Sequence, residues 1–162
     1  MPLLKRGKLV DDPWTHVADE VAIPALGPVI VGLKRWRNER ETLLKRADSV
    51  GVRLKSDHTA GDVAEDLEHL GVVALAFPVF KDGRAYTNAR RLRERYGYKG
   101  EIRAIGNVLR DQYLFMLRCG FDALEVKEGE TEQGWEKAVR AFSVFYQPAA
   151  DGQATVLSLR HR

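Results

Sequence analysis

The stretch that decides the fold is VVALAFPVFKDGRAYTNARRLRERYGYKGEIRAIGNVLRDQYLFMLRCGFDALEV, residues 72–126. Its first part, Val72 to Phe77, is an almost unbroken apolar run, which is typical of a strand buried on both faces. Polar loops and helical patterns then alternate with further short apolar runs. We therefore predict strands at 72–77, 101–105 and 121–126, separated by helices that end at Gly97 and Gly120.

The same alternation extends toward the N-terminus. Short β-branched or apolar runs predict strands at 29–31 and 52–54, with a helix around Trp36 between them. Thr59 and Asp62 have the spacing of a helix-capping box, so a further helix is expected to begin there. Residues 1–27 contain several prolines and are predicted to be irregular, apart from a short strand or hairpin near Lys8–Val10.

Residues 128–162 are predicted to add one helix and one strand. Thr131 is placed to cap a helix that buries Trp135 and Phe142, and residues 154–159 resemble a terminal strand. The whole chain of 162 residues is expected to be a single domain, with the core at residues 29–127.

The fold class follows from the repeated strand–helix order. Connections that contain a helix join parallel strands, so we predict an α/β protein with a mostly parallel sheet and helices packed outside it. The sheet could be open or curved like part of a barrel, and hydrophobic periodicity does not distinguish the two.

The amino-acid composition limits the kinds of binding partner and the cellular compartment that we expect. Basic and acidic residues nearly balance, at 26 and 23. The continuous basic stripe with interleaved aromatics that marks a nucleic-acid-binding protein is missing. No apolar run is long enough for a membrane span or a signal peptide, and Cys119 is the only cysteine. We expect a cytoplasmic protein that binds neither nucleic acid nor membrane.

The first candidate site is the loop after the strand at 72–77. Asp82-Gly83 can form a tight turn, and the following helix would direct free N–H groups into the loop. Arg84 and the hydroxyl of Tyr86 could complete an anion site there. The alternative is a capped helix in which Asp82 itself accepts those N–H groups.

The second candidate site follows the strand at 101–105. Arg103 lies inside this strand, where it either pairs with Glu101 on the same face or reaches a ligand in the mouth of a curved sheet. Arg110, Asp111 and Gln112 then begin an apolar helix, where they orient a ligand or cap the helix. Since both loops follow parallel strands, they should meet at one edge of the sheet and form an arginine-lined rim.

Other chemistry has little support in the sequence. His58 beside Asp57 is more typical of a solvated histidine than of a proton-transfer pair, and His16 and the other histidines lack metal-binding spacing. Cys119 is interpreted as a small buried hydrophobe. Glycine-rich cofactor loops and Cys-x-x-Cys pairs do not occur, so we expect no metal and no cofactor, and catalytic residues stay unassigned.

A long motif resembles a known family. It comprises Phe77-Pro78-x-Phe80-x-Asp82-Gly83-Arg84-x-Tyr86, residues 89–106, Val108-Leu109-Arg110-Asp111-Gln112 and Arg118-Cys119-Gly120-Phe121-Asp122. This pattern is similar to a bacterial domain-of-unknown-function family whose members are often encoded beside sulfite reductase genes. The resemblance spans about residues 29–127, with Thr87 where serine is expected and Asn107 where aspartate is expected.

The resemblance implies an accessory protein of assimilatory sulfite reduction, which would bind an anionic small molecule or sulfite reductase through the arginine-lined rim. The alternative is a small barrel-like enzyme, a lyase, isomerase or oxidoreductase acting on an anionic substrate. A third possibility is a structural homodimer, because the helix at 109–119 is apolar enough to pack against a second copy.

Overall fold

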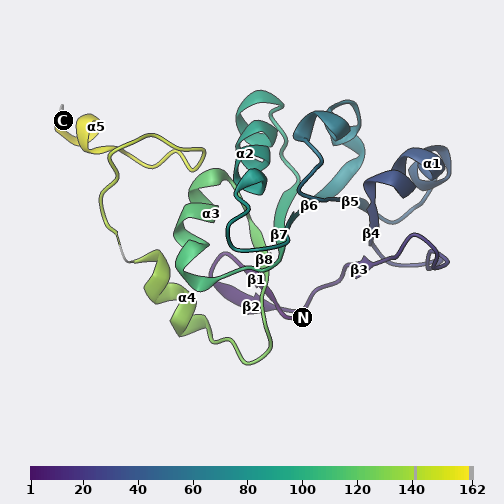
Figure 1. Cartoon of the computed structure of the whole chain (residues 1–162), viewed down its shortest axis with the longest axis horizontal. Helices are drawn as coiled ribbons and strands as arrows, with labels where there is room; N and C mark the ends of the chain where they lie inside the picture. The colour runs from purple at the N-terminus through teal and green to yellow at the C-terminus, as the bar shows by residue number, and fades with distance from the viewer. Residues whose placement is uncertain (141, 161–162) are drawn as a thin grey trace.

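The structure is a computed structural model that describes residues 1–140 and 142–160. A single sheet of eight strands, in the order β2-β1-β8-β7-β6-β5-β4-β3, curls into a half-barrel (Figure 1). The neighbouring strands from β3 to β8 are parallel, whereas β1 is antiparallel to both β2 and β8. The predicted fold class is therefore confirmed, and the curved form is the one adopted.

The strands are β1 (Leu3–Lys5), β2 (Lys8–Val10), β3 (Thr15–His16), β4 (Val29–Gly32), β5 (Val50–Leu54), β6 (Leu70–Phe77), β7 (Glu101–Gly106) and β8 (Ala123–Glu125). The α-helices are α1 (Leu33–Leu44), α2 (Arg84–Arg90), α3 (Tyr113–Cys119), α4 (Glu132–Val139) and α5 (Val156–Arg160). The 3₁₀-helices η1 (Ala60–His69) and η3 (Arg110–Gln112) and the π-helical turn η2 (Arg91–Arg95) complete the elements.

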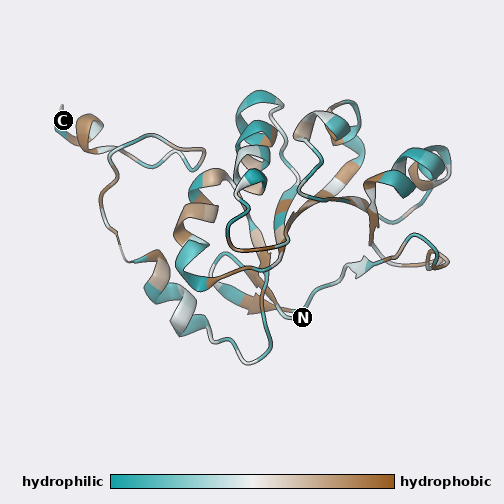
Figure 2. Cartoon of the chain, viewed as in Figure 1, coloured by the Kyte–Doolittle hydropathy of each residue, from teal (hydrophilic) through white to brown (hydrophobic). Residues whose placement is uncertain are grey.

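The two faces of the sheet differ in what covers them. Helices α1, α2 and η1 pack on the outer face of the sheet (Figure 2). There, alternate strand residues such as Val52 and Leu75 join Trp36 and Leu92 in the main core. The concave face carries a smaller apolar cluster, which consists of Ile30, Val72, Ala74 and Ile105 with Trp14 packed against it. This division follows from the strand period of two, which sends successive side chains to opposite faces.

The predicted strand or hairpin near Lys8–Val10 is confirmed, but the rest of the segment 1–27 is less irregular than expected, because it also contributes β1 and β3 to the sheet. Residues Leu3–Lys5 and Lys8–Val10 form a hairpin around Arg6-Gly7, where both residues have positive φ, and β1 extends the sheet beside β8. Strands of three residues are too short to produce a period-two signal, and their pairing partner lies at the other end of the chain.

A short connection forces the sheet to curl. Strands β2 and β3 lie at opposite edges of the sheet, yet only residues 11–14 join them. The span from Val10 to Thr15 can therefore be no more than about 19 Å. We call residues 11–14 the strap, because they connect the two edges of the half-barrel.

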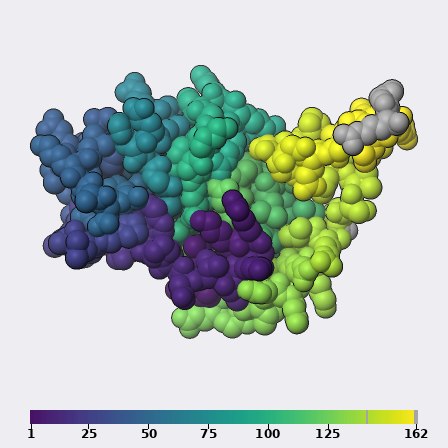
Figure 3. Space-filling view, turned by 180° about the vertical axis from the view of Figure 1, so that it is seen from behind, coloured from purple at the N-terminus to yellow at the C-terminus, as the bar shows by residue number. Residues whose placement is uncertain are grey.

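The predicted terminal strand at 154–159 is also wrong. Residues Val156–Arg160 form the short helix α5, and Phe145 and Thr155 beside it form an isolated β-bridge. Phe142, which was predicted to be buried in the preceding helix, follows that helix and is 67% exposed. Residues 142–160, which we call the arm, project from the body (Figures 1 and 3).

Several local predictions are confirmed. Thr59 and Asp62 form the capping box of η1, and Gly120 ends α3 with φ of 99°. Trp135 is buried in α4, as expected. Within residues 1–140 and 142–160, no helix combines the length and the apolar character needed to cross a membrane.

Candidate functional site

Arg84 begins α2 after the loop that follows β6, and it is tied to its own loop. Its Nη2 and Nε donate to the two carboxylate oxygens of Asp82 at 2.7 and 3.0 Å, and Nη2 also donates to Ser56 Oγ at 3.1 Å. Asp82 also accepts the backbone N–H of Arg84, as the capped-helix alternative required. These bonds hold the pKa of Asp82 far below its usual range. The Arg84 side chain is still 61% exposed.

Arg110 begins η3, after the loop that follows β7, and its side chain reaches the loop after β8. It forms an ion pair with Glu130, and Gly134 in α4 lies against its guanidinium group. Asp111 is exposed at the start of η3. The side-chain oxygen of Gln112 is buried without a hydrogen-bond partner among the described residues.

Arg84 and Arg110 therefore follow adjacent parallel strands at one edge of the sheet, but they point apart. Arg84 turns toward Ser56 after β5, whereas Arg110 turns toward Glu130 after β8. None of the main cavities in the described part of the chain is lined by either residue. The role of both residues in binding stays a prediction.

Tyr86 faces an aromatic cluster. Its ring lies 5.0 Å from that of Phe77 and 4.8 Å from that of Phe115, measured between centroids. Burial raises the pKa of the Tyr86 hydroxyl to about 12, so the group stays protonated at neutral pH.

Arg103 is fully buried on the concave face and binds three carboxylates. It donates to Asp12 at 2.6 and 3.1 Å, to Glu101 at 2.9 Å and to Glu125 at 3.2 Å. The predicted pairing with Glu101 is present, and Ala74 beside Arg103 on β6 leaves room for the long side chain. Since its three nitrogens are all engaged by the protein, Arg103 holds the strap to the sheet.

A cavity lies where the two sides of the half-barrel meet. Its volume is about 370 Å³, and Met1, Asp12, Trp14, His16 and Glu125 line it. We call this place the seam. His16 Nε2 lies 2.6 Å from Glu125 Oε1. His16 and Glu125 are each the last residue of a parallel strand, β3 and β8, which is the edge where α/β barrels place their reactive groups.

The electrostatics of Glu125 fit a fixed, ionised carboxylate. Burial alone raises its pKa, but the hydrogen bonds and charges of His16 and Arg103 outweigh burial, so the pKa lies below its ordinary value. An ionised carboxylate that accepts a hydrogen bond from an imidazole fixes the orientation of that ring. The seam therefore presents an oriented histidine to a cavity.

Sequence reasoning missed Asp12, His16 and Glu125. One signal was available for Glu125, which is a charged residue inside the apolar run 121–126, just as Arg103 is charged within its own strand. The contact between His16 and Glu125 joins residues 109 positions apart, so no local pattern could indicate it.

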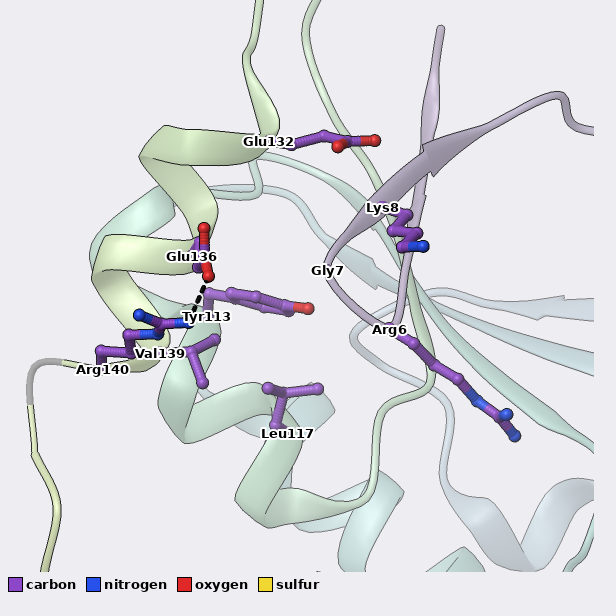
Figure 4. Close-up of a pocket in the computed structure, with 9 residues that line it drawn as sticks. All are labelled: Arg6, Gly7, Lys8, Tyr113, Leu117, Glu132, Glu136, Val139 and Arg140. Carbon is purple, nitrogen blue, oxygen red and sulfur yellow. Dashed lines mark hydrogen bonds and ion pairs between the residues drawn. The ribbon is translucent and has the colours of Figure 1, made fainter.

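The largest cavity described, about 460 Å³, lies between the β1–β2 turn and helices α3 and α4 (Figure 4). Tyr113 lies between the turn and α4, and the side chain of Arg6 points away from the helices. The acidic groups here are already paired, because Glu136 binds Arg140 at 2.5 Å and Glu132 accepts the N–H of Leu9 at 2.8 Å. The bond between Leu9 and Glu132 holds the β1–β2 hairpin against α4, so we assign this cavity a structural role.

The fold and the seam define an α/β half-barrel protein with a histidine–carboxylate pair at the carboxyl ends of its strands. The chain belongs to the family described as "Bacterial protein of unknown function (DUF934)", which matches residues 51–157. No curated protein matches the chain. The family resemblance is thus confirmed, and the connection to sulfite reduction stays a prediction.

Proposed function

We propose that this protein is an accessory protein of assimilatory sulfite reduction that docks on an acidic patch of the reductase. The docking surface is the rim, which consists of Asp82, Arg84, Tyr86, Arg110, Asp111 and Gln112. The observation that carries the proposal is that Arg84 and Arg110, 61% and 47% exposed, follow adjacent strands at one edge of the sheet.

The arrangement of the rim favours a macromolecular partner over a small anion. Arg84 and Arg110 point apart and lie outside the main cavities, so they cannot enclose a small ligand together. Exposed ion pairs contribute only about 0–1 kcal/mol, so carboxylates of a partner can replace Glu130 at little cost. Asp82 and Ser56 occupy Nε and Nη2 of Arg84 and keep its planar guanidinium in one orientation, so Nη1 is the nitrogen that can donate to a carboxylate of the partner.

The test is co-purification from bacteria that grow on sulfate or sulfite as the sulfur source. The tagged chain should retain reductase, and Arg84→Ala combined with Arg110→Ala should lose it and slow growth on these sources. Arg37→Ala combined with Arg140→Ala is a matched control, because both arginines are exposed and ion-paired elsewhere. Reductase retention and normal growth in the rim variant would contradict the proposal.

The seam supports a second candidate, an enzyme acting on a small anionic substrate. His16 is oriented by Glu125 beside a cavity and can exchange a proton with a bound molecule. Arg53 lies on the same concave face, next to Ala74 on β6. If this candidate holds, His16→Gln should fail to restore growth to a deletion strain although the variant folds and still binds the reductase. Normal growth with His16→Gln would exclude the seam as a catalytic site.

A further inference from the structure

We infer that a second surface, between α2, α3 and the arm, binds an acidic protein segment that carries an aromatic or aliphatic anchor. This surface is a groove of about 280 Å³ whose main lining residues are Arg90, Phe115, Arg118, Phe145 and Tyr146. We call it the aromatic groove.

One residue of the body, Arg118, positions the arm. Its guanidinium lies over the ring of Phe145, 3.9 Å from the centroid, and donates to the carbonyl of Gln147 at 2.5 Å and to Asp151 at 3.2 Å. The carbonyl of Arg118 also accepts the N–H of Ala150 at 3.0 Å. These contacts fix the course of the arm, so the groove has a defined wall on that side.

Two aromatic side chains of the groove are exposed to solvent. Phe115 is 55% exposed and Tyr146 is 76% exposed, so neither ring is buried in the hydrophobic core. Phe115 rests on Tyr86, which in turn packs on the buried Phe77, so its ring has a rigid base. Rigid, exposed aromatic rings are the side chains that dominate binding energy at protein interfaces.

Arg90 is the charged side chain of the groove that favours an acidic partner, because Arg118 is already bound to Asp151 and to the carbonyl of Gln147. Both of its charged lining residues are arginines, Arg90 and Arg118. Their carboxylate partners, Glu94 and Asp151, are not among the lining residues. Arg90 donates through Nε and Nη2 to Glu94 but is 51% exposed, and this exposed ion pair contributes little, so Arg90 can also bind a carboxylate that approaches from solvent. Arginine beside aromatic rings fits a segment that alternates Asp or Glu with an apolar anchor.

The arm belongs to the domain that the family shares. The family match extends to residue 157 and so includes most of residues 142–160.

The inference does not depend on the proposed function, because the aromatic groove and the rim arginines use different residues. A fluorescent peptide of sequence Asp-Glu-Phe-Glu-Asp-Leu-Glu tests it directly, with Lys-Lys-Phe-Lys-Lys-Leu-Lys as the charge-reversed probe. Fluorescence anisotropy should show saturable binding of the acidic peptide alone. Phe115→Ala combined with Tyr146→Ala should weaken that binding about tenfold or more.

Three further variants complete the experiment. Phe80→Ala removes a phenylalanine that is also 55% exposed, and its binding should stay within about twofold of the parent protein. Arg90→Glu should weaken binding of the acidic peptide, because it replaces the positive charge of the groove with a negative one. Arg84→Ala with Arg110→Ala should leave peptide binding intact, which separates this result from the test of the rim.

Three results would overturn the inference. The first is acidic peptide binding that Phe115→Ala with Tyr146→Ala does not change, or no binding at all. The second is binding to phosphatidylglycerol vesicles, lost in the same variant, without peptide binding, which would assign the groove to a lipid surface. The third is a dimer in sedimentation experiments that Phe115→Ala dissociates, which would assign it to a second copy.

Discussion

His16 Nε2 lies 2.6 Å from Glu125 Oε1, and this contact joins an edge strand, β3, to β8, which is third from the opposite edge. Asp12 in the strap binds Arg103 on the neighbouring strand β7. A parallel sheet of six strands would normally continue to twist outward as an open sheet. Here, polar contacts across the concave face and the short strap hold it in a half-barrel.

The seam should lose stability when Glu125 is neutralised. Glu125→Gln keeps the shape but weakens the bonds to His16 and Arg103, so the free energy of unfolding should fall by about 1–3 kcal/mol at pH 7. Lys127→Gln, an exposed change nearby, should have no such effect. Urea denaturation of both variants, followed by circular dichroism, measures the difference.

The loss caused by Glu125→Gln should depend on pH in one direction. The pKa of Glu125 is lower in the folded protein than in the unfolded chain, so its contribution is present above an unfolded pKa of about 4.3 and disappears as pH falls through the folded value. The stability difference between the parent protein and Glu125→Gln should therefore shrink below about pH 4. A difference that grows on acidification would contradict this assignment.

Arg103 should be the most sensitive single position of the concave face. Arg103→Met would leave Asp12, Glu101 and Glu125 close together, with Lys5 and His16 as their remaining cationic partners, and should cost about 3–5 kcal/mol of folding free energy. Adding Asp12→Asn and Glu125→Gln to Arg103→Met should recover part of that loss. Thermal unfolding of the single and triple variants tests this, and a triple variant less stable than Arg103→Met would contradict it.

The parallel strands β4 to β8 and the helices between them could be predicted, because short stretches of sequence specify each of these elements. The buried strand β6 is a continuous apolar run, and the capping box at Thr59 and the left-handed Gly120 mark helix ends within a few residues. The curl could not be predicted, since it depends on β1 pairing with β8 and on the strap. Periodicity does not encode contacts between the two ends of a chain.

In the candidate site, too, contacts between nearby residues could be predicted from the sequence, and contacts between distant residues could not. Arg103 and Glu101 are two residues apart on one strand face, so their pairing follows from the sequence. Topology also placed the loops of Arg84 and Arg110 at one edge of the sheet. The directions of these side chains depend on Ser56 and Glu130, in loops that are distant in sequence, and no pattern specified those choices.

Cys119 should react slowly in the folded protein, and the arm should control its reactivity. Burial raises its pKa to about 11, so only about one thiol in a thousand is ionised at pH 8. Arg118→Ala removes the anchor of the arm, which forms one wall of the groove that Cys119 also lines, and should speed the reaction with a thiol reagent at least tenfold. Arg140→Ala is the control. Equal rates in the parent protein and Arg118→Ala would contradict the role of Arg118 as anchor.

Gly71 should be required for the Trp14 ring, which lines the seam, to pack against the sheet. A Cβ atom at position 71 would lie 2.9 Å from Cη2 of the Trp14 ring, so Gly71→Ala must displace the indole. The change should cost about 1–3 kcal/mol of folding free energy. It should also shift tryptophan fluorescence to the red, because Trp36 and Trp135 are fully buried and Trp14 is the ring that would gain contact with water. Gly83→Ala, where the added carbon would meet its nearest neighbour at an ordinary 3.7 Å, should leave the spectrum unchanged. If Gly71→Ala keeps the spectrum and stability of the parent protein, Trp14 is not held against the sheet, and the seam does not have the shape described above.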